Sequence, residues 1–149
     1  HGLVEGFAIG AYAIGAETCY IYIRGEFTEP LLRLEAALKE AYAAGILGKN
    51  AMGSGKTVNV YVHKGAGSYI CGEETAMMNS LEGRRGNPRI KPPFPAQAGL
   101  WNKPTNVNNV ESYANAPMIM RNGPAWWSGV SSAKEKGTKM FTFSGSVNW

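Results

Sequence analysis

The strongest constraint on the fold is a repeated order of one amphipathic segment followed by one short apolar run. Apolar residues recur at helical spacing over 3–14, and Gly15 follows as a stop signal. The run 19–23, Cys-Tyr-Ile-Tyr-Ile, favours a strand buried on both faces. A second helix over 28–45 and a second strand over 57–62 repeat the order. This alternation predicts an α/β domain with a mainly parallel sheet, because parallel strands need crossover helices.

Local signals predict a less regular second half of the chain. We expect a glycine-rich loop over 64–72, followed by a short helix over 73–81. Residues 83–104 contain five prolines, which favour an extended path rather than helix or strand. A further helix is expected over 106–122, and a last strand over 139–144. In the first half, we also expect Thr28 to cap the second helix.

Composition excludes several function classes. Glycine supplies 19 of 149 residues, about 13% against the ~7% typical of proteins, so bare backbone is available for close approach to a ligand. A net charge of +4 is too small an excess to predict nucleic-acid binding. No apolar run is long enough to insert into a membrane. Cys19 and Cys71 lie far apart without a CxxC motif, so we predict no metal site and a reducing compartment.

The most informative stretch is 65–74, Gly-Ala-Gly-Ser-Tyr-Ile-Cys-Gly-Glu-Glu, between a predicted strand and a predicted helix. Open α/β sheets place ligands at such turns. It is not a GxGxxG fingerprint, because Ile70 stands where the third glycine is due. Glu73 and Glu74 would repel phosphate, so they should address sugar hydroxyls or a ring edge. An ordinary capped helix after a turn remains the alternative.

A second predicted helix start lies at 105–111, Thr-Asn-Val-Asn-Asn-Val-Glu. Asparagine side chains can cap the helix, and its first amides suit a phosphate group. The simpler interpretation makes Glu111 a capping-box partner. If both turns are functional, we expect the turn before Glu73 and the turn before Asn109 to border one cleft, each holding one end of a ligand.

The chain also carries a local basic run, formed by Arg84, Arg85, Arg89 and Lys91. A solvated face is one explanation of these charges. The prolines that follow favour another, since they would hold Lys91 and Phe94 in a fixed relation that suits a dinucleotide.

Gly-Ser-Gly-Lys-Thr at 53–57 imitates part of a phosphate-binding P-loop. The full motif needs a glycine where Asn50 stands. It also follows a strand and opens a helix, whereas this stretch precedes a strand. Nucleotide hydrolysis through Lys56 is therefore rejected.

Four blocks in order resemble one family: 65–76, 81–86, 91–96 and 104–111. This is the flavin-bearing, NADH-oxidising subunit of respiratory complex I, with relatives in NAD-coupled hydrogenases and formate dehydrogenases. The resemblance extends to residues 14–16 and 20–26 and so covers nearly the whole chain.

The resemblance implies a Rossmann-like, three-layer FMN domain in which NADH stacks on the flavin and transfers a hydride to it. The flavin carries the chemistry, so no side chain is expected to be a catalytic acid or base. Lys91 and Phe94 would contact NADH together with Glu74, and Phe94 would stack on the adenine. The cofactor-binding residues that it implies lie in the two turns: Tyr69, Gly72, Glu73 and Glu74 beside the flavin ring, and Thr105, Val107, Asn108 and Asn109 at the ribityl-phosphate end.

The resemblance also implies a division into domains. Residues 1–136 would be the central part of the FMN and NADH domain, and 137–149 the first strand of a truncated β-grasp domain. The family's upstream glycine-rich flavin loop and the cysteines of its [4Fe–4S] cluster lie outside this sequence, so the cluster would belong to a longer parent only. Implied partners are NADH and iron–sulfur subunits, in the cytoplasm or the mitochondrial matrix, peripheral to the membrane.

One alternative from another functional class remains. Without the upstream loop, the chain could be a non-catalytic piece that scaffolds neighbouring iron–sulfur subunits. Flavin binding discriminates between the two hypotheses.

Overall fold

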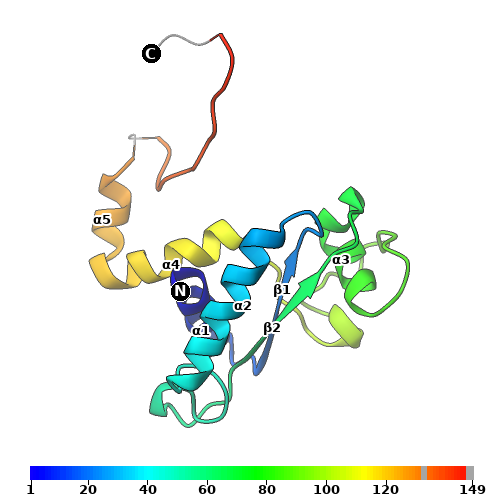
Figure 1. Ribbon diagram of the computed structural model, residues 1–149, viewed down its shortest axis with the longest axis horizontal. Helices are drawn as coiled ribbons and strands as arrows, with labels where there is room; N and C mark the ends of the chain where they lie inside the picture. The colour runs from blue at the N-terminus through cyan, green and yellow to red at the C-terminus, as the bar shows by residue number, and fades with distance from the viewer. Residues whose placement is uncertain (132–133, 147–149) are drawn as a thin grey trace.

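The computed structural model describes residues 1–131 and 134–146. Helices and strands alternate in its first half, and an irregular segment separates α3 from α4 (Figure 1). The elements are α1 (Gly2–Ile14), β1 (Thr18–Ile23), α2 (Thr28–Ala43), β2 (Asn59–Lys64), α3 (Glu74–Leu81), α4 (Val110–Asn122) and α5 (Pro124–Gly129), with short 3-10 turns η1 (Ala51–Gly53), η2 (Tyr69–Gly72) and η3 (Leu100–Asn102).

The described sheet has two parallel strands, β1 and β2, joined by the crossover helix α2. Thr18 pairs with Asn59, and the register continues to Ile23 opposite Lys64. The α/β class and the parallel pairing are therefore confirmed. β2 begins two residues later than expected. The expectation that β1 is buried on both faces was wrong, because only Ile21 of that strand is buried.

An apolar cluster lies between the sheet and the first two helices. α1 contributes Val4, Phe7 and Ala11, which face Ile21 of β1 and Val60 of β2. Each of these side chains is less than one-tenth exposed. Burial of this kind stabilises a fold by about 1.5–3 kcal/mol for each large side chain, so this cluster fixes the frame that carries the loops.

Two glycines of α1 allow α4 to pack unusually close. A Cβ added at Gly6 would overlap the carbonyl oxygen of Tyr113, and one added at Gly10 would lie 2.6 Å from the Tyr113 ring. That ring stacks on Phe7 with centroids 4.3 Å apart. Close packing of the two helices therefore determines where the start of α4 lies.

Three expectations about the starts of α2 and α4 were wrong in detail. α2 begins at Thr28 itself, and no side chain caps it. The helix expected from residue 106 begins only at Val110, because Asn109 caps it and the residues before are extended. Glu111 is not a capping-box partner, since its carboxylate instead pairs with Lys139 at 2.8 Å.

The strand expected over 139–144 is not formed. These residues run without helix or strand, as do the other described residues beyond α5 (Figure 1). A strand requires a hydrogen-bonded neighbour, and the described part of the chain supplies none here. Residues 147–149 of the expected β-grasp segment lie outside the described residues. The division into domains at 136 stays a prediction.

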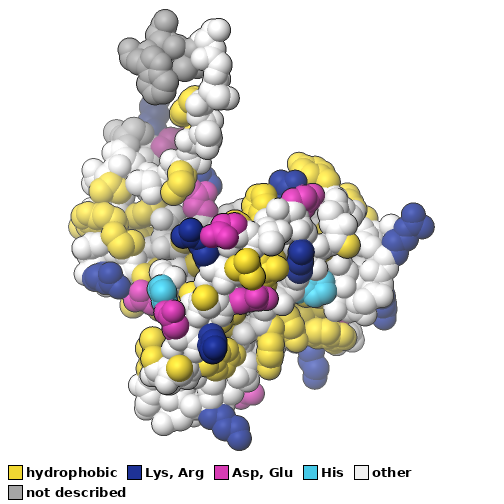
Figure 2. Space-filling model, in the orientation of Figure 1, with side chains coloured by type: hydrophobic (Ala, Val, Ile, Leu, Met, Phe, Trp, Pro, Cys, Tyr) yellow, Lys and Arg dark blue, Asp and Glu magenta, His cyan; other side chains and the backbone are white. Residues whose placement is uncertain are grey.

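Figure 2 shows acidic and basic side chains interspersed on one face of the molecule rather than gathered by sign. Among the described residues, no helix combines the length and hydropathy required to cross a bilayer.

Candidate functional site

The turn before α3 and the turn before α4 border one cavity of about 690 Å³. This confirms the expectation that they share a cleft. The wall on the β2 side includes Tyr69 and Gly72, and the opposite wall includes Val107, Asn108 and Asn109. The volume lies within the roughly 300–1,000 Å³ range of small-molecule sites.

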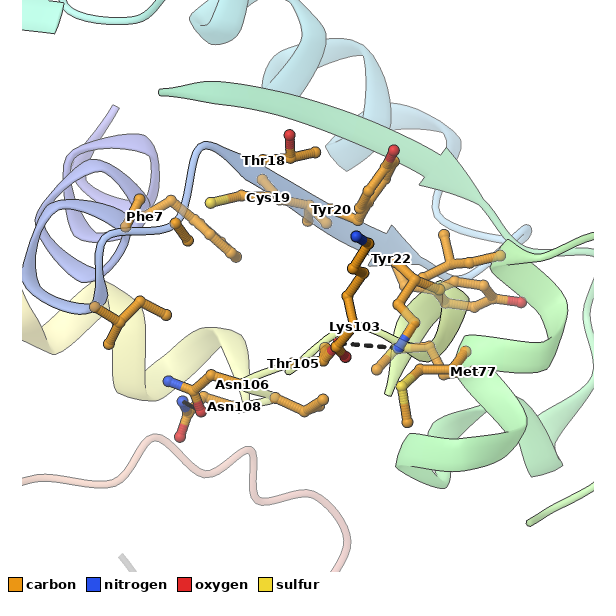
Figure 3. A pocket seen from close by; sticks show the side chains of 18 of the residues that line it. Phe7, Thr18, Cys19, Tyr20, Tyr22, Met77, Lys103, Thr105, Asn106 and Asn108 are labelled. Carbon is orange, nitrogen blue, oxygen red and sulfur yellow. Dashed lines mark hydrogen bonds between the residues drawn. The ribbon is translucent and has the colours of Figure 1, made fainter. Parts of the chain in front are cut away.

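A second cavity of about 520 Å³ shares part of this wall. Figure 3 shows it from close by, with β1 side chains on one side and the segment before α4 on the other. Val107 and Asn108 line both cavities, whereas Thr105 lines only this one. Hence one of the four residues expected in the second turn does not line the larger cavity.

Glycines in the larger cavity fall into two physical groups. Gly65 is required by the fold, since a Cβ there would lie 2.8 Å from the Tyr22 ring. Gly72 is different: a Cβ there meets no atom within 4 Å, although the residue lines the cavity. Its bare backbone therefore leaves room that the protein itself does not fill.

Glu73 is the N-cap of α3. One carboxylate oxygen accepts the amides of Thr75 and Ala76 at 2.9 Å each, and also the Thr75 hydroxyl. Partial desolvation opposes ionisation, but these hydrogen bonds and one from Lys91 outweigh it and lower the pKa of Glu73 to about 2. The capped-helix interpretation is thus confirmed for this residue, and its free oxygen points to Lys91.

Lys91 lies between the two acids. Its Nζ is 2.5 Å from Glu74 and 3.2 Å from Glu73. The hydrogen bond with Glu74, supported by Glu73, raises the pKa of Lys91. None of the three lines the larger cavity, and neither does Phe94, whose side chain is 55% exposed. Lys91 and the two acids therefore form a group outside the larger cavity, and Glu73 and Glu74 do not line it as expected of residues beside the flavin ring.

The asparagines before α4 are tied to one another and to the helix. The Asn109 side chain accepts the amide of Glu111 at 2.8 Å, and the Asn108 amide group donates to Asn106 at 3.0 Å. Thr105 accepts the amide of Leu100 at 2.9 Å. Because a helix start carries partial positive charge, this wall of the cavity favours an anionic group.

Sequence reasoning missed two charged residues of the larger cavity, Arg24 and Glu26. They form an ion pair at 3.6 Å, and the Arg24 guanidinium lies 5.1 Å from the centre of the Phe27 ring. Their signal was available, because both directly follow β1 at the carboxyl end of the sheet, where α/β proteins bind ligands.

Most of the basic run has structural partners. Arg89 contacts the nearly buried carboxylate of Glu82 at 2.7 Å, and its other nitrogens donate to Asn79 and to the carbonyl of Gly99. Desolvation acts against ionisation of Glu82, but Arg89 and the Trp101 amide lower its pKa. Arg84 stays mostly exposed, 3.7 Å from Glu82.

Lys56 also has a structural role, in agreement with the rejected P-loop. Its Nζ lies 4.4 Å from the centre of the Tyr12 ring and donates to the Tyr12 carbonyl at 3.4 Å. Within the described ranges, no cluster of three or more His, Cys, Asp or Glu side chains could hold a metal ion.

Residues 1–118 match the Nuo51 FMN-binding domain family. The chain belongs to that family. The Nuo51 match spans β1, β2, α3 and both turns of the larger cavity, and it ends within α4.

Two curated relatives are named as a component of NADH-quinone oxidoreductase. The protein from Rickettsia rickettsii is 54% identical over 148 residues, which is 99% of this chain and 35% of the relative. The protein from Salmonella typhimurium is 56% identical over 147 residues, or 99% of this chain and 33% of the relative. This Nuo51 chain thus spans about a third of the length of the curated relatives it matches.

Solved structures agree with this placement. A chain of the NAD⁺-reducing [NiFe]-hydrogenase in its H₂-reduced state superposes with a TM-score of 0.80 at 38% identity. The alignment covers 91% of this Nuo51 chain and 22% of the hydrogenase chain. The air-oxidised state gives a TM-score of 0.78 with the same coverage.

Proposed function

We propose that the chain binds FMN in the larger cavity and serves as part of a module that oxidises NADH. Family membership and the sequence identity to the NADH-quinone oxidoreductase relatives support this function. The observation that carries it is the cavity between the glycine-rich turn and the start of α4. Glu74, Lys91 and Phe94 are the proposed NADH contacts.

The residues of the cavity fit FMN in size and charge. Gly72 leaves open backbone on one wall, which suits the close approach of a flat ring. Asn108, Asn109 and the first turn of α4 form the wall that favours a phosphate. Arg24 adds a cation to the same cavity. Glu26 pairs with Arg24 in this cavity, whereas Glu73 and Glu74 do not line it.

FMN, when bound, supplies the ability to accept a hydride. The chain's own residues would bind and orient the two molecules. Tyr69 and Gly72 would flank the flavin ring, and Val107, Asn108 and Asn109 would hold its phosphate end, with Thr105 supporting that turn from behind. Glu74, held by Lys91 at 2.5 Å, would face the sugar hydroxyls of NADH, and Phe94 would stack on the adenine. None of these residues needs to transfer a proton.

The finer features of the assembly belong to the same proposal. The parallel pair would be part of a three-layer, Rossmann-like sheet, and residues 137–149 would begin a β-grasp domain. Iron–sulfur subunits would accept the electrons, with a [4Fe–4S] cluster in a longer parent. The complex would lie in the cytoplasm or the mitochondrial matrix, against the membrane but not in it.

FMN titration of the chain, followed by flavin fluorescence, tests the proposal. Gly72→Val should weaken FMN binding at least about tenfold, because its side chain would enter space that the ring needs. Gly129→Val is the matched control, since Gly129 also has no neighbour within 4 Å but does not line the cavity. Wild-type chain that binds no FMN would refute the proposal and favour the scaffold alternative.

Addition of NADH to the flavin-loaded protein tests the second part of the proposal, the oxidation of NADH. Flavin absorbance should fall as the flavin is reduced, without added metal. Retention of full absorbance with excess NADH would show that this chain binds the cofactor but does not engage the donor.

A further inference from the structure

One buried polar group in the molecule has no place in the proposed function: the hydroxyl of Thr75. It belongs to the first turn of α3 and is only 2% exposed. A buried hydroxyl costs free energy unless it is hydrogen-bonded, so its partners indicate why it is there. The hydroxyl has two hydrogen-bond partners, one in the cap of α3 and one in the segment after the helix.

The Thr75 hydroxyl donates to Glu73 at 2.5 Å and accepts the backbone amide of Arg89 at 2.7 Å. Glu73 in turn contacts Lys91 with its other oxygen. The hydroxyl therefore joins the cap of α3 to the irregular segment that carries Lys91. Its bond to the Glu73 carboxylate has a charged acceptor, and such hydrogen bonds are stronger than neutral ones.

Arg89 fixes the same segment a second time through its side chain. Its guanidinium reaches Asn79 on α3 at 2.9 Å, Glu82 at 2.7 Å and the Gly99 carbonyl at 3.0 Å. The segment around residue 89 is thus held against α3 both by its backbone and by its side chain. Because Lys91 lies only two residues further on, these contacts also restrict its position.

We infer that Thr75 is a positioning residue for NADH: its hydroxyl sets where Glu73 and Lys91 stand, and so where Glu74 is held. The inference rests on the proposed function. Thr75 lines neither FMN-side wall of the larger cavity, so its effect should reach NADH and spare FMN.

The test compares Thr75→Val with Thr75→Ser. Valine keeps the shape and removes the hydroxyl, whereas serine keeps the hydroxyl. Thr75→Val should weaken NADH binding to the FMN-loaded chain about tenfold while FMN affinity stays within about twofold. Thr75→Ser should restore NADH affinity to nearly the wild-type value. Equal losses of FMN and NADH affinity, or no rescue by serine, would overturn the inference.

Amide hydrogen exchange provides a readout without NADH. The Arg89 amide should exchange faster in Thr75→Val than in wild type or Thr75→Ser, because its acceptor is gone. Unchanged exchange overturns the inference even if NADH binds. A wild-type chain that binds no NADH refutes the proposed function instead, and exchange alone then decides whether Thr75 positions the segment.

If Thr75→Val does not fold, Glu73→Asp breaks the same connection at a partly exposed position. Aspartate still caps a helix well, but its shorter side chain cannot hold Thr75 and Lys91 together. NADH affinity should fall as in Thr75→Val. An unchanged NADH affinity would count against the inference.

Discussion

The turn before α3 and the turn before α4 line the same cavity, but different forces hold them. A charged cap holds the first, because Glu73 directly follows that turn, accepts the first amides of α3 and pairs with Lys91. Close helix packing holds the second, because α4 lies directly on the glycines of α1. The first should therefore respond to pH and the second to side-chain volume.

The largest expected effect removes the charged contact that holds the segment after α3 against this helix. Arg89→Met should lower the free energy of unfolding by about 3 kcal/mol, because the nearly buried Glu82 carboxylate loses its main partner. Urea denaturation at pH 7 measures the change. Arg84→Met is the matched control: it faces the same carboxylate but is 74% exposed, so it should cost less than about 0.5 kcal/mol. Equal losses of unfolding free energy in the two variants would show that the Arg89–Glu82 contact stabilises the fold no more than the exposed Arg84 does.

The next prediction concerns the turn before α4, whose position depends on the packing of α4 against α1. Gly6→Ala should cost about 1–3 kcal/mol in free energy of unfolding, because a Cβ there overlaps the Tyr113 backbone and forces α4 outward. Gly2→Ala, on the same helix but with open space around it, should be neutral or slightly stabilising. Thermal denaturation compares the pair. Similar melting temperatures for both variants would contradict the close packing.

The smallest expected effect is the pH dependence of the stability that Glu73 contributes to the turn before α3. The folded pKa of Glu73, about 2, lies below its ordinary value of 4.5, so its contribution is complete above pH 5 and is lost as pH falls towards 2. Glu73→Gln should therefore cost roughly 1–2 kcal/mol at pH 7, after allowance for solvent screening, and almost nothing near pH 2.

Urea denaturation across that pH range measures it. Gly6→Ala should instead keep a constant deficit over the same window, since no ionisable group lies at its site of overlap. A Glu73→Gln deficit that does not change with pH would mean that the charge of this residue does not stabilise the turn.

Much of the frame could be predicted from local patterns. Apolar spacing located α1, Gly15 ended it, and β1 was found within one residue. The asparagine before α4 was expected as a cap, and Asn109 is one. The turn before α3 follows β2, where parallel strands place their ligands, and the turn before α4 was expected beside it as a second helix start.

The errors came from interactions between distant residues. Glu111 satisfied a capping pattern but is paired with Lys139, a partner that no local rule can find. For Lys91, whose contact with NADH stays a prediction, no local rule showed the two carboxylate partners that the structure gives it. In the sequence Arg89 was one of the four residues of a local basic run, whereas in the fold it is the one of those four that contacts Glu82 at short distance.

The sequence by itself determined the order of elements, the parallel pairing and the family, because these depend on residue spacing and residue type along the chain. Only the tertiary structure decided which charges neutralise one another and which backbone stays open at the cavity. Thr75 illustrates the reason: its role depends on Arg89, and that contact exists only once the segment after α3 has folded back onto the helix.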